Sequence, residues 1–334
     1  MSPVAFLVPT GVHDERHPSG GNRYDVELAA ALRLTGWRAR MIEVAAEPDA
    51  IAAAVADVPG GDPILVDGLL LETGIGTSAL EEHRFVPLLH MPPVSGAALG
   101  LLGRADAVVT TSGWTRDRVR EHVPSATPLA VALPGVRPTR LVSTSPTGRR
   151  IRCVGAVAPH KGQDVLVDAL GRLAHRTWRC ELVGPTDVDP AFVRSVRDLA
   201  ARLGIADRVA LTGPRHANPL DGLYSGCDLL VLPSRAESYG MVVAEALACG
   251  VPVIASATGG VREALDPSAG LLVRPGDPDG LAAALDAWLT REDLRRRLTA
   301  GARSCGARRR TWSAAAALVA DRLAAAPALR TAER

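Results

Sequence analysis

The sequence alternates, over almost its whole length, between short β-branched runs and longer stretches rich in alanine and leucine with a helical period. This alternation is typical of parallel sheets joined by crossover helices, because a parallel strand is covered on both faces and reads as an unbroken apolar run. We therefore expect an α/β protein. A chain of 334 residues exceeds one ordinary domain, so two such sheets are predicted.

The predicted strands fall into two groups. They lie near Val4–Val8, Arg38–Val44, Pro63–Val66, Phe85–Leu89, Ala107–Thr111 and Pro128–Ala132, and then near Ile151–Val157, Arg179–Val183, Val209–Thr212, Leu229–Leu232 and Val253–Ser256. Residues 137–150, between the groups, are rich in Pro, Ser, Thr and Arg without periodicity, as in a linker. The predicted division is residues 1–137 for an acceptor-side domain, 138–149 for the linker, 150–312 for a donor-side domain, and 313–334 for a C-terminal helix that could pack back on the first domain.

Composition excludes several classes of protein. The net charge is +2, and no segment interleaves dense arginine with aromatic residues, so no nucleic-acid partner is expected. The five cysteines are odd in number and contain no C-x-x-C pair, which favours neither disulfides nor zinc and indicates a reducing compartment. The first residues show no signal-peptide pattern and no apolar run reaches about 18 residues, so we expect a cytoplasmic protein.

An arginine-rich region near the C-terminus leaves a peripheral contact with the inner membrane surface open. The alternative is a solvated helix face. Its arginines are Arg295, Arg296, Arg297, Arg303, Arg308, Arg309 and Arg310.

Candidate binding residues follow predicted strands, and in open α/β sheets ligands bind beyond the carboxyl ends of the strands. After the first strand, a long turn ends in Ser19-Gly20-Gly21-Asn22 before a helix near Arg23. Its glycines permit close approach of the backbone to an anion or hydroxyl, although a plain helix-capping turn is an equal alternative. The spacing does not match the G-x-G-x-x-G pattern of dinucleotide-binding proteins.

Lys161 follows the first strand of the second group, within Gly155-Ala156-Val157-Ala158-Pro159-His160-Lys161-Gly162. It is the only lysine among 38 basic residues of the Lys and Arg types, and it stands where a helix begins. An ammonium beside free helix N–H groups suits phosphate oxygens. The alternative is an exposed basic residue in a turn.

Two glutamates, Glu237 and Glu245, flank the start of another predicted helix after the strand Leu229–Leu232. The N–H groups from Ser238 to Val242 would form the helix N-terminus and attract negative charge. Carboxylates at such a place can hold sugar or ribose hydroxyls through paired hydrogen bonds. Taken singly, each glutamate could instead be an ordinary charged residue on a solvated helix.

These motifs resemble those of the family-four retaining glycosyltransferases, from about Ile151 to Asp286. Glu237 to Glu245 match the family's E-x7-E pattern and Lys161-Gly162 its K-G. Thr258 to Glu263 resemble its glycine turn, and Gly270 to Asp277 its G-hydrophobic-P-x-D segment. The resemblance implies the GT-B fold, with two Rossmann-like doubly wound domains facing a cleft. It also implies transfer of a sugar from a nucleoside-diphosphate sugar with retention of anomeric configuration and without a metal.

The same resemblance suggests a role for each matching residue. Lys161 would bind the donor diphosphate, Glu245 the ribose and Glu237 the hydroxyls of the transferred sugar, while His90 would lie on the opposite wall near the reacting carbon. The implied catalytic residues are His90, Glu237 and Lys161. The implied donor-binding residues are Gly21, Lys161, Ser238, Tyr239, Gly240, Met241, Val242 and Glu245.

One residue departs from the family pattern, which has Gly-Arg at the start of the donor domain. Here Gly155 is followed by Ala156, so the arginine that helps to neutralise the leaving diphosphate is absent. Arg235 and Arg262 are the candidate substitutes, and weaker donor binding is the alternative.

No metal and no cofactor besides the nucleotide sugar is predicted. Asp187-Val188-Asp189 is interpreted as a turn, and His13, Asp14 and His17 as an unliganded or acceptor-binding loop. The nucleotide base and the sugar stay open, as does the acceptor, which could be a glycan, a lipid or a small molecule. Two rival functions also stay open: a GT-B epimerase or phosphorylase, and a non-catalytic nucleotide-sugar-binding protein.

Overall fold

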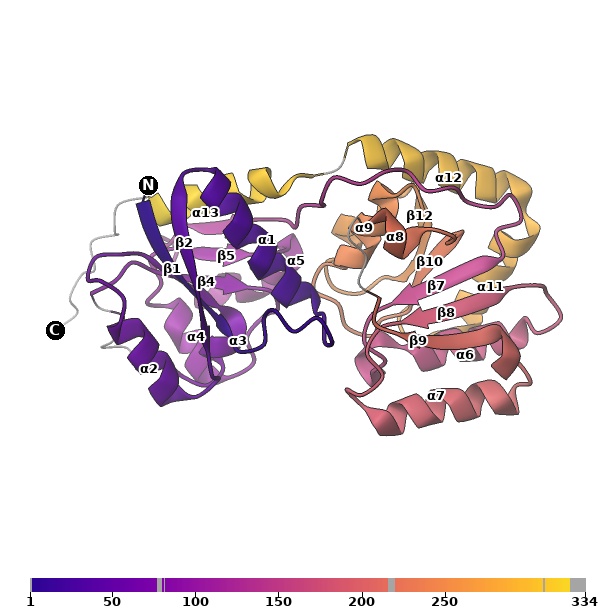
Figure 1. Ribbon diagram of the computed structural model, residues 1–334, viewed down its shortest axis with the longest axis horizontal. Coiled ribbons are helices and arrows are strands. Elements are labelled where there is room, and N and C mark those ends of the chain that lie inside the picture. The colour runs from indigo at the N-terminus through magenta and orange to yellow at the C-terminus, as the bar shows by residue number, and fades with distance from the viewer. Residues whose placement is uncertain (1, 77–79, 81, 216–219, 309, 325–334) are drawn as a thin grey trace. The chain divides into compact units, whose positions relative to one another are not determined.

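The computed structural model describes residues 2–76, 80, 82–215, 220–308 and 310–324. Its described residues divide into two compact units, each built on one six-stranded sheet (Figure 1). The first unit takes in residues 1–13, 21–135 and 310–334, and the second takes in 14–20 and 136–309. All recorded strand pairs are parallel, which confirms the predicted α/β class with two successive Rossmann-like sheets.

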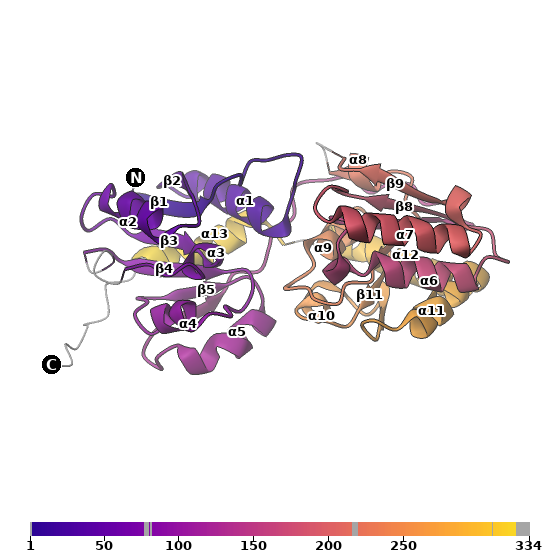
Figure 2. The same ribbon diagram turned by 90° about the horizontal axis from the view of Figure 1, so that it is seen from below.

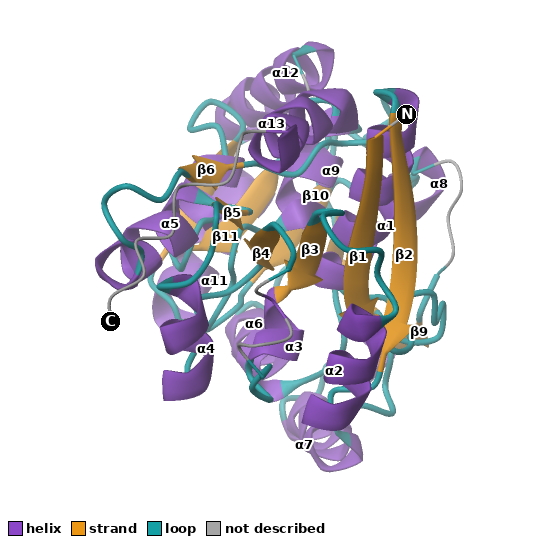
Figure 3. Cartoon of the chain, turned by 90° about the vertical axis from the view of Figure 1, so that its left-hand side faces the viewer, coloured by secondary structure: helices purple, strands orange, loops and turns teal. Residues whose placement is uncertain are grey.

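The sheet of the first unit has the strand order β2-β1-β3-β4-β5-β6. Its strands are β1 (Ser2–Pro9), β2 (Trp37–Val44), β3 (Ile64–Asp67), β4 (Phe85–Leu89), β5 (Val108–Thr110) and β6 (Leu129–Val131). Its helices are α1 (Gly20–Leu34), α2 (Pro48–Ala56), α3 (Gly68–Leu71), α4 (Gly96–Leu102), α5 (Gly113–Val119) and α13 (Trp312–Ala324). In Figure 3, α13 lies on one side of the row of strands and α2, α3 and α4 lie on the other. Residues buried on both faces explain why these strands read as continuous apolar runs.

The C-terminal helix α13 packs within the first unit. The rings of Tyr24 and Trp312 meet edge to face with centroids 5.2 Å apart. The Arg84 guanidinium also donates a 2.9 Å hydrogen bond to the carbonyl of Arg322. The helix therefore contributes to the core on the α1 side of the sheet. Of the segment predicted as a C-terminal helix, residues 325–334 lie outside the described part of the chain.

The sheet of the second unit has the strand order β12-β11-β10-β7-β8-β9. Its strands are β7 (Arg150–Val154), β8 (Arg179–Val183), β9 (Val209–Gly213), β10 (Leu229–Leu232), β11 (Val253–Ser256) and β12 (Gly270–Val273). Its helices are α6 (Gln163–Arg172), α7 (Pro190–Arg202), α8 (Asp221–Tyr224), α9 (Met241–Ala248), α10 (Val261–Ala264), α11 (Pro278–Thr290) and α12 (Glu292–Ala307). Figure 2 shows α6 and α7 in front of this sheet and α12 behind it.

The segment predicted as a linker, residues 138–149, packs on the second unit. Val142 donates its N–H to the carbonyl of Cys249 at 2.9 Å, and Ser145 donates its N–H to the buried Asp228 carboxylate at 2.6 Å. Figure 1 shows the segment running beside α12. Among the described residues, no helix is both long enough and apolar enough to cross a membrane.

Candidate functional site

Three loops meet at the carboxyl edge of the second sheet, following β7, β10 and β11. Arg235 of the β10 loop donates its N–H to the carbonyl of His160 in the β7 loop at 2.8 Å. Gly260 of the β11 loop donates its N–H to the carbonyl of Ser238 at 3.0 Å. The strand order places β7, β10 and β11 side by side, so their carboxyl ends form one continuous surface.

Two glycines permit the close approach of these loops. Gly162 has φ +69°, and a Cβ there would lie 2.2 Å from the carbonyl oxygen of Pro233. Gly259 has φ +55°, and a Cβ there would lie 1.5 Å from the carbonyl oxygen of Glu237. Both glycines belong to the predicted motifs, so loop packing requires glycine at these two positions whether or not a ligand is bound.

Lys161 and Glu237 form an ion pair on this surface. Nζ of Lys161 donates to Oε2 of Glu237 at 2.8 Å, and the side chains are 24% and 13% exposed. The hydroxyl of Ser234 lies 3.4 Å from the same carboxylate oxygen. An ammonium and a carboxylate thus stand together in a partly desolvated place, where charge interactions are stronger than in bulk water.

The predicted donor-binding backbone begins α9. Gly240 is its N-cap residue with φ +87°, and as a glycine it has no side chain that could cap the helix. The first N–H groups of a helix have no partner within it and carry partial positive charge. Ser238, Met241 and Val242 are half-buried, whereas Tyr239 is buried. The start of α9 therefore presents main-chain donors on the edge of the sheet that also carries Lys161.

Glu245, one turn further along α9, is only 2% exposed. Its Oε2 accepts a hydrogen bond from the Tyr224 hydroxyl of α8 at 3.0 Å. That hydroxyl also lies 3.1 Å from the carbonyl of Val242. The second glutamate of the motif is therefore a buried, hydrogen-bonded carboxylate rather than a solvated helix residue.

The two arginines considered as substitutes at Ala156 lie in different settings. The Arg235 guanidinium is held by the Asp164 carboxylate at 2.6 and 2.8 Å and by the carbonyl of Pro159 at 2.7 Å. Arg262 is exposed on α10. The carbonyl of Ala156 itself accepts a hydrogen bond from the Gln163 side chain at 2.8 Å. The Arg235 side chain is thus bound to the loop that carries Lys161 and to the helix that follows it.

The remaining predicted residues, Gly21 and His90, lie together in the first unit. His90 follows β4, and a Cβ on Gly21 would be 3.3 Å from Cδ2 of the His90 ring. Nε2 of His90 lies 2.9 Å from Oδ1 of Asp25 and 3.5 Å from Oδ2 of Asp67. Both carboxylates are fully buried, and neither was predicted as a site residue.

These three side chains perturb each other's protonation. Burial by itself would lower the pKa of His90, but the neighbouring Asp25 and Asp67 carboxylates raise it to about 10. Burial and the Asp67 charge raise the pKa of Asp25 to about 8, against the opposing effect of His90. Burial also opposes ionisation of Asp67, yet hydrogen bonds from His90 and from the Leu69 N–H hold its pKa below the usual value. Although one ligand atom from each side chain lies within 4.8 Å of the others, we interpret the group as a hydrogen-bonded ion pair with a second carboxyl.

The two polar loops interpreted as free of metal, around Asp189 and around Asp14, make hydrogen bonds within the protein. Asp189 caps α7 by accepting the N–H of Phe192 at 2.9 Å. Asp14 accepts hydrogen bonds from Arg16 and from Nδ1 of His17, which hold its pKa below the usual value.

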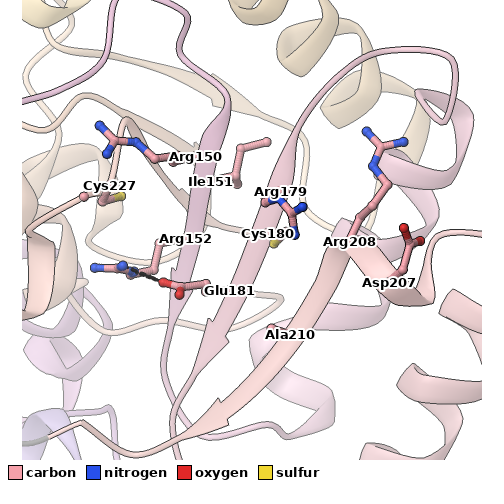
Figure 4. Close-up of a pocket in the computed structure, with 11 residues that line it drawn as sticks. Arg150, Ile151, Arg152, Arg179, Cys180, Glu181, Asp207, Arg208, Ala210 and Cys227 are labelled. Carbon is pink, nitrogen blue, oxygen red and sulfur yellow. Dashed lines mark hydrogen bonds and ion pairs between the residues drawn. The ribbon is translucent and has the colours of Figure 1, made fainter.

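A cavity of about 430 Å³ opens at the amino ends of β7, β8 and β9, on the edge of the second sheet opposite to the three loops. Figure 4 shows arginine, glutamate and aspartate side chains around it, with Arg152 paired to Glu181. Arg150 pairs with the buried Asp228 at 2.7 Å. Arg150 and Arg152 already have carboxylate partners, and the predicted motifs lie at the opposite edge of the sheet. We therefore do not assign the donor site to this cavity.

The second unit is similar in sequence to known glycosyltransferases. Residues 143–304 match the family model described as Glycosyl transferases group 1. The D-inositol 3-phosphate glycosyltransferase of Xylanimonas cellulosilytica is 42% identical over 168 residues, which are 50% of this chain and 40% of that protein. The protein of the same name from Acidothermus cellulolyticus is 32% identical over 258 residues, 65% of this chain and 57% of that protein. The chain thus spans about half the length of the curated relatives that it matches.

Solved structures match over nearly the whole chain. Sucrose-phosphate synthase from Thermosynechococcus elongatus has a TM-score of 0.81 at 23% identity, covering 96% of this chain and 98% of that one. Anabaena HepE in complex with UDP-glucose has a TM-score of 0.78 at 20% identity, covering 97% and 99%. The family match supports the glycosyltransferase resemblance inferred from the motifs between Ile151 and Asp286. Residues 143–304 are thus similar to the group 1 glycosyl transferases, and the chain has the two-sheet fold of GT-B glycosyltransferases.

Proposed function

We propose that the chain is a glycosyltransferase that moves a sugar from a nucleoside-diphosphate sugar to an acceptor. The observation that carries the proposal is the convergence of the Lys161–Glu237 pair with the uncapped start of α9 at one edge of the second sheet. Departure of a nucleoside diphosphate develops negative charge, and fixed cations and main-chain dipoles stabilise such charge most strongly where water is partly excluded. The second unit supplies a cation in Lys161 and main-chain dipoles at the start of α9.

In this proposal Lys161 binds the diphosphate, and Glu237 both orients the ammonium and accepts hydroxyls of the transferred sugar. The 2.8 Å contact keeps the ammonium at the edge of the sheet before the donor arrives. Glu245 binds the nucleotide ribose. This carboxylate is buried beside Tyr224. The ribose diol would therefore approach it from the α9 side of the surface formed by the three loops. Ser238 to Val242 contact sugar and phosphate oxygens. The roles of His90 and Gly21 toward the ligand are proposed from the family resemblance alone.

Retention of anomeric configuration and independence from metals belong to the proposal. The family resemblance supports retention. Lys161 and the start of α9 support metal independence, because they supply positive charge that a divalent cation would otherwise provide.

Only the comparisons indicate which donor and which acceptor to test first. Anabaena HepE was solved with UDP-glucose, so UDP-glucose is the first donor to test. The relatives are named for D-inositol 3-phosphate, which makes it the first acceptor to test. The family match lies in the second unit and says nothing of an acceptor, so a glycan, a lipid or another small molecule is equally admissible.

We propose a cytoplasmic location, with contact at the inner membrane surface as the open extension. Part of the arginine-rich region already has structural contacts. Arg295 donates to the carbonyls of Trp288 and Leu289 at 2.8 and 3.1 Å, and Arg296 pairs with Glu292. Arg309 lies outside the described residues. Liposome binding by the full chain, with and without anionic lipid, tests this extension.

A second candidate function is a non-catalytic protein that binds nucleotide sugars. Ala156 favours it, because the family arginine is absent and Arg235 is held by Asp164 instead of being free to replace it. This candidate predicts nucleotide binding without turnover over a panel of acceptors. An epimerase or phosphorylase would instead convert the donor in the absence of an acceptor.

Isothermal titration with UDP and assays of transfer from UDP-glucose test the site assignment. Lys161→Ala and Glu245→Gln should each weaken UDP binding by tenfold or more, the effect of losing a charged hydrogen bond worth about 1.5–3 kcal/mol. Glu237→Gln should mainly lower the rate of transfer. The control is Glu292→Gln, which changes an exposed glutamate of α12. If all four variants bind UDP and turn over alike, the site is assigned wrongly.

A further inference from the structure

The His90 side chain is fixed from several elements of the first unit. Its ring contacts Gly21 of α1 and meets the Tyr24 ring edge to face, with centroids 5.2 Å apart. Its Nε2 faces Asp25 of α1 and Asp67 at the end of β3. The side chain is 13% exposed, whereas both carboxylates are fully enclosed. Nε2 of the ring is therefore turned toward the two buried carboxylates, and a small part of the side chain is exposed.

The hydrogen bonds of the two carboxylates differ. Asp67 caps α3 by accepting the N–H of Leu69 at 2.6 Å on Oδ1, and its other oxygen faces His90. Asp25 uses Oδ1 for His90, and its Oδ2 has no hydrogen-bond partner among the described residues although it is buried. Two buried carboxylates next to one imidazole would leave uncompensated charge if both were ionised, and such charge is costly.

One arrangement of protons satisfies this cluster. An imidazolium opposite an ionised Asp67 gives a neutral pair, and a proton on Asp25 removes the excess negative charge. The pKa directions of all three groups agree with it. Among the described residues, Tyr24 also faces the ring; its hydroxyl donates to the carbonyl of Ala132 at 2.8 Å, and burial raises its pKa. From the β5–α5 side, Thr111 and Thr115 offer only neutral hydroxyls, each 3.5 Å from the carbonyl of His90.

We propose that Asp25 and Asp67 are positioning residues which hold His90 as an imidazolium, with Nε2–H directed at the carboxylates and Nδ1–H left as a second hydrogen-bond donor. In this state His90 cannot act as a general base. It donates to an oxygen of the ligand, either a sugar hydroxyl or a phosphate oxygen. The inference deepens the proposed function, on which the role of His90 toward the donor depends, but the protonation of the ring can be measured without any substrate.

The test is a histidine titration by NMR of the full chain carrying ¹³Cε1-labelled histidine, with the His90 signal assigned by its loss in His90→Gln. In the wild-type protein the signal should keep the imidazolium shift from pH 5.5 to 8.5, where an ordinary histidine with a pKa near 6.5 loses its proton. In Asp67→Asn the proton association constant of His90 should fall at least tenfold, whereas Asp25→Asn, which replaces a carboxyl that is already neutral in this arrangement, should lower it less. The control is Asp117→Asn, an exposed carboxylate of α5 that should leave the His90 signal unchanged.

Kinetics supply a readout that a purely structural role would not move. The kcat of the wild type should stay level from pH 6 to 8, whereas the kcat of Asp67→Asn should fall as the pH rises and His90 loses its proton. The KM for the donor should change less than kcat.

Several results would overturn the proposal. They are a wild-type His90 that titrates near pH 6.5, unchanged titration in Asp67→Asn, or a His90 signal that Zn²⁺ or Mg²⁺ shifts at micromolar concentration and EDTA restores. Absence of transfer activity alongside the expected titration would refute the proposed function and leave the protonation of His90 established.

Discussion

Gly259→Ala is the substitution whose effect can be worked out most directly from the structure. At φ +55° an alanine costs about 1–2 kcal/mol in backbone strain. Its Cβ would also stand 1.5 Å from the carbonyl oxygen of Glu237, and an ordinary contact of 3.4 Å requires a displacement of about 2 Å. Overpacking of this kind adds about 1–3 kcal/mol. Because Glu237 holds Lys161 at 2.8 Å, moving its backbone should also pull apart the ion pair.

Gly276→Ala is the matched control. Gly276 has φ +69° in the same unit, but nothing lies within 4 Å of where its Cβ would be. The two variants share the backbone strain and differ in the clash. Urea unfolding should therefore show Gly259→Ala less stable than Gly276→Ala by about 1–3 kcal/mol. Titration with UDP should show an affinity at least tenfold lower for Gly259→Ala, and near the wild-type value for Gly276→Ala.

Equal free energies of unfolding and equal UDP affinities in the two alanine variants would refute this reasoning. The glycine turn would then not set the position of Glu237. Loss of stability without loss of UDP affinity would show that the loops pack as described but do not hold the nucleotide.

Two further predictions concern pH and metals. Asp228 is buried and accepts hydrogen bonds from Ser145 and Arg150, which lower its pKa although burial opposes this. A lowered pKa means that the stabilisation is present above the usual value of 3.8 and is lost as the pH falls, so Asp228→Asn should cost about 1.5–3 kcal/mol in urea unfolding at pH 7 and clearly less at pH 3. If the cost is the same at both pH values, the carboxylate charge is not its source. Excess EDTA should leave the rate of transfer unchanged, and loss of transfer that Mg²⁺ or Mn²⁺ restores would contradict the metal-independent proposal.

Much of the fold is predictable because parallel strands buried on both faces leave a local signal. Phe85–Leu89, Arg179–Val183, Leu229–Leu232 and Val253–Ser256 are strands with the predicted bounds. β12 was not predicted as a strand, since it is an edge strand that begins with a glycine and is only partly buried. β7 ends at Val154 rather than Val157, because the turn toward Lys161 begins at Gly155.

Some residues of the candidate site could likewise be predicted from the sequence, and others could not. Lys161 and Glu237 each lie in the loop that follows a buried strand, so their meeting at one edge of the sheet follows from the rule for parallel sheets. Asp25 and Asp67 were missed. Asp67 does carry a signal, since it is an acidic residue that ends a buried strand. Asp25 carries none, because one acidic residue within an amphipathic helix resembles any solvated charge.

The sequence by itself determined the α/β class, most strand positions and the residues that end those strands, because periodicity and turn chemistry act over a few neighbouring residues. Only the tertiary structure decided which strands are neighbours, that Glu245 is buried against Tyr224, and that two distant carboxylates enclose His90. The physical reason is that burial and charge coupling depend on the order in which strands pair, and strand order is set by the packing of the whole unit.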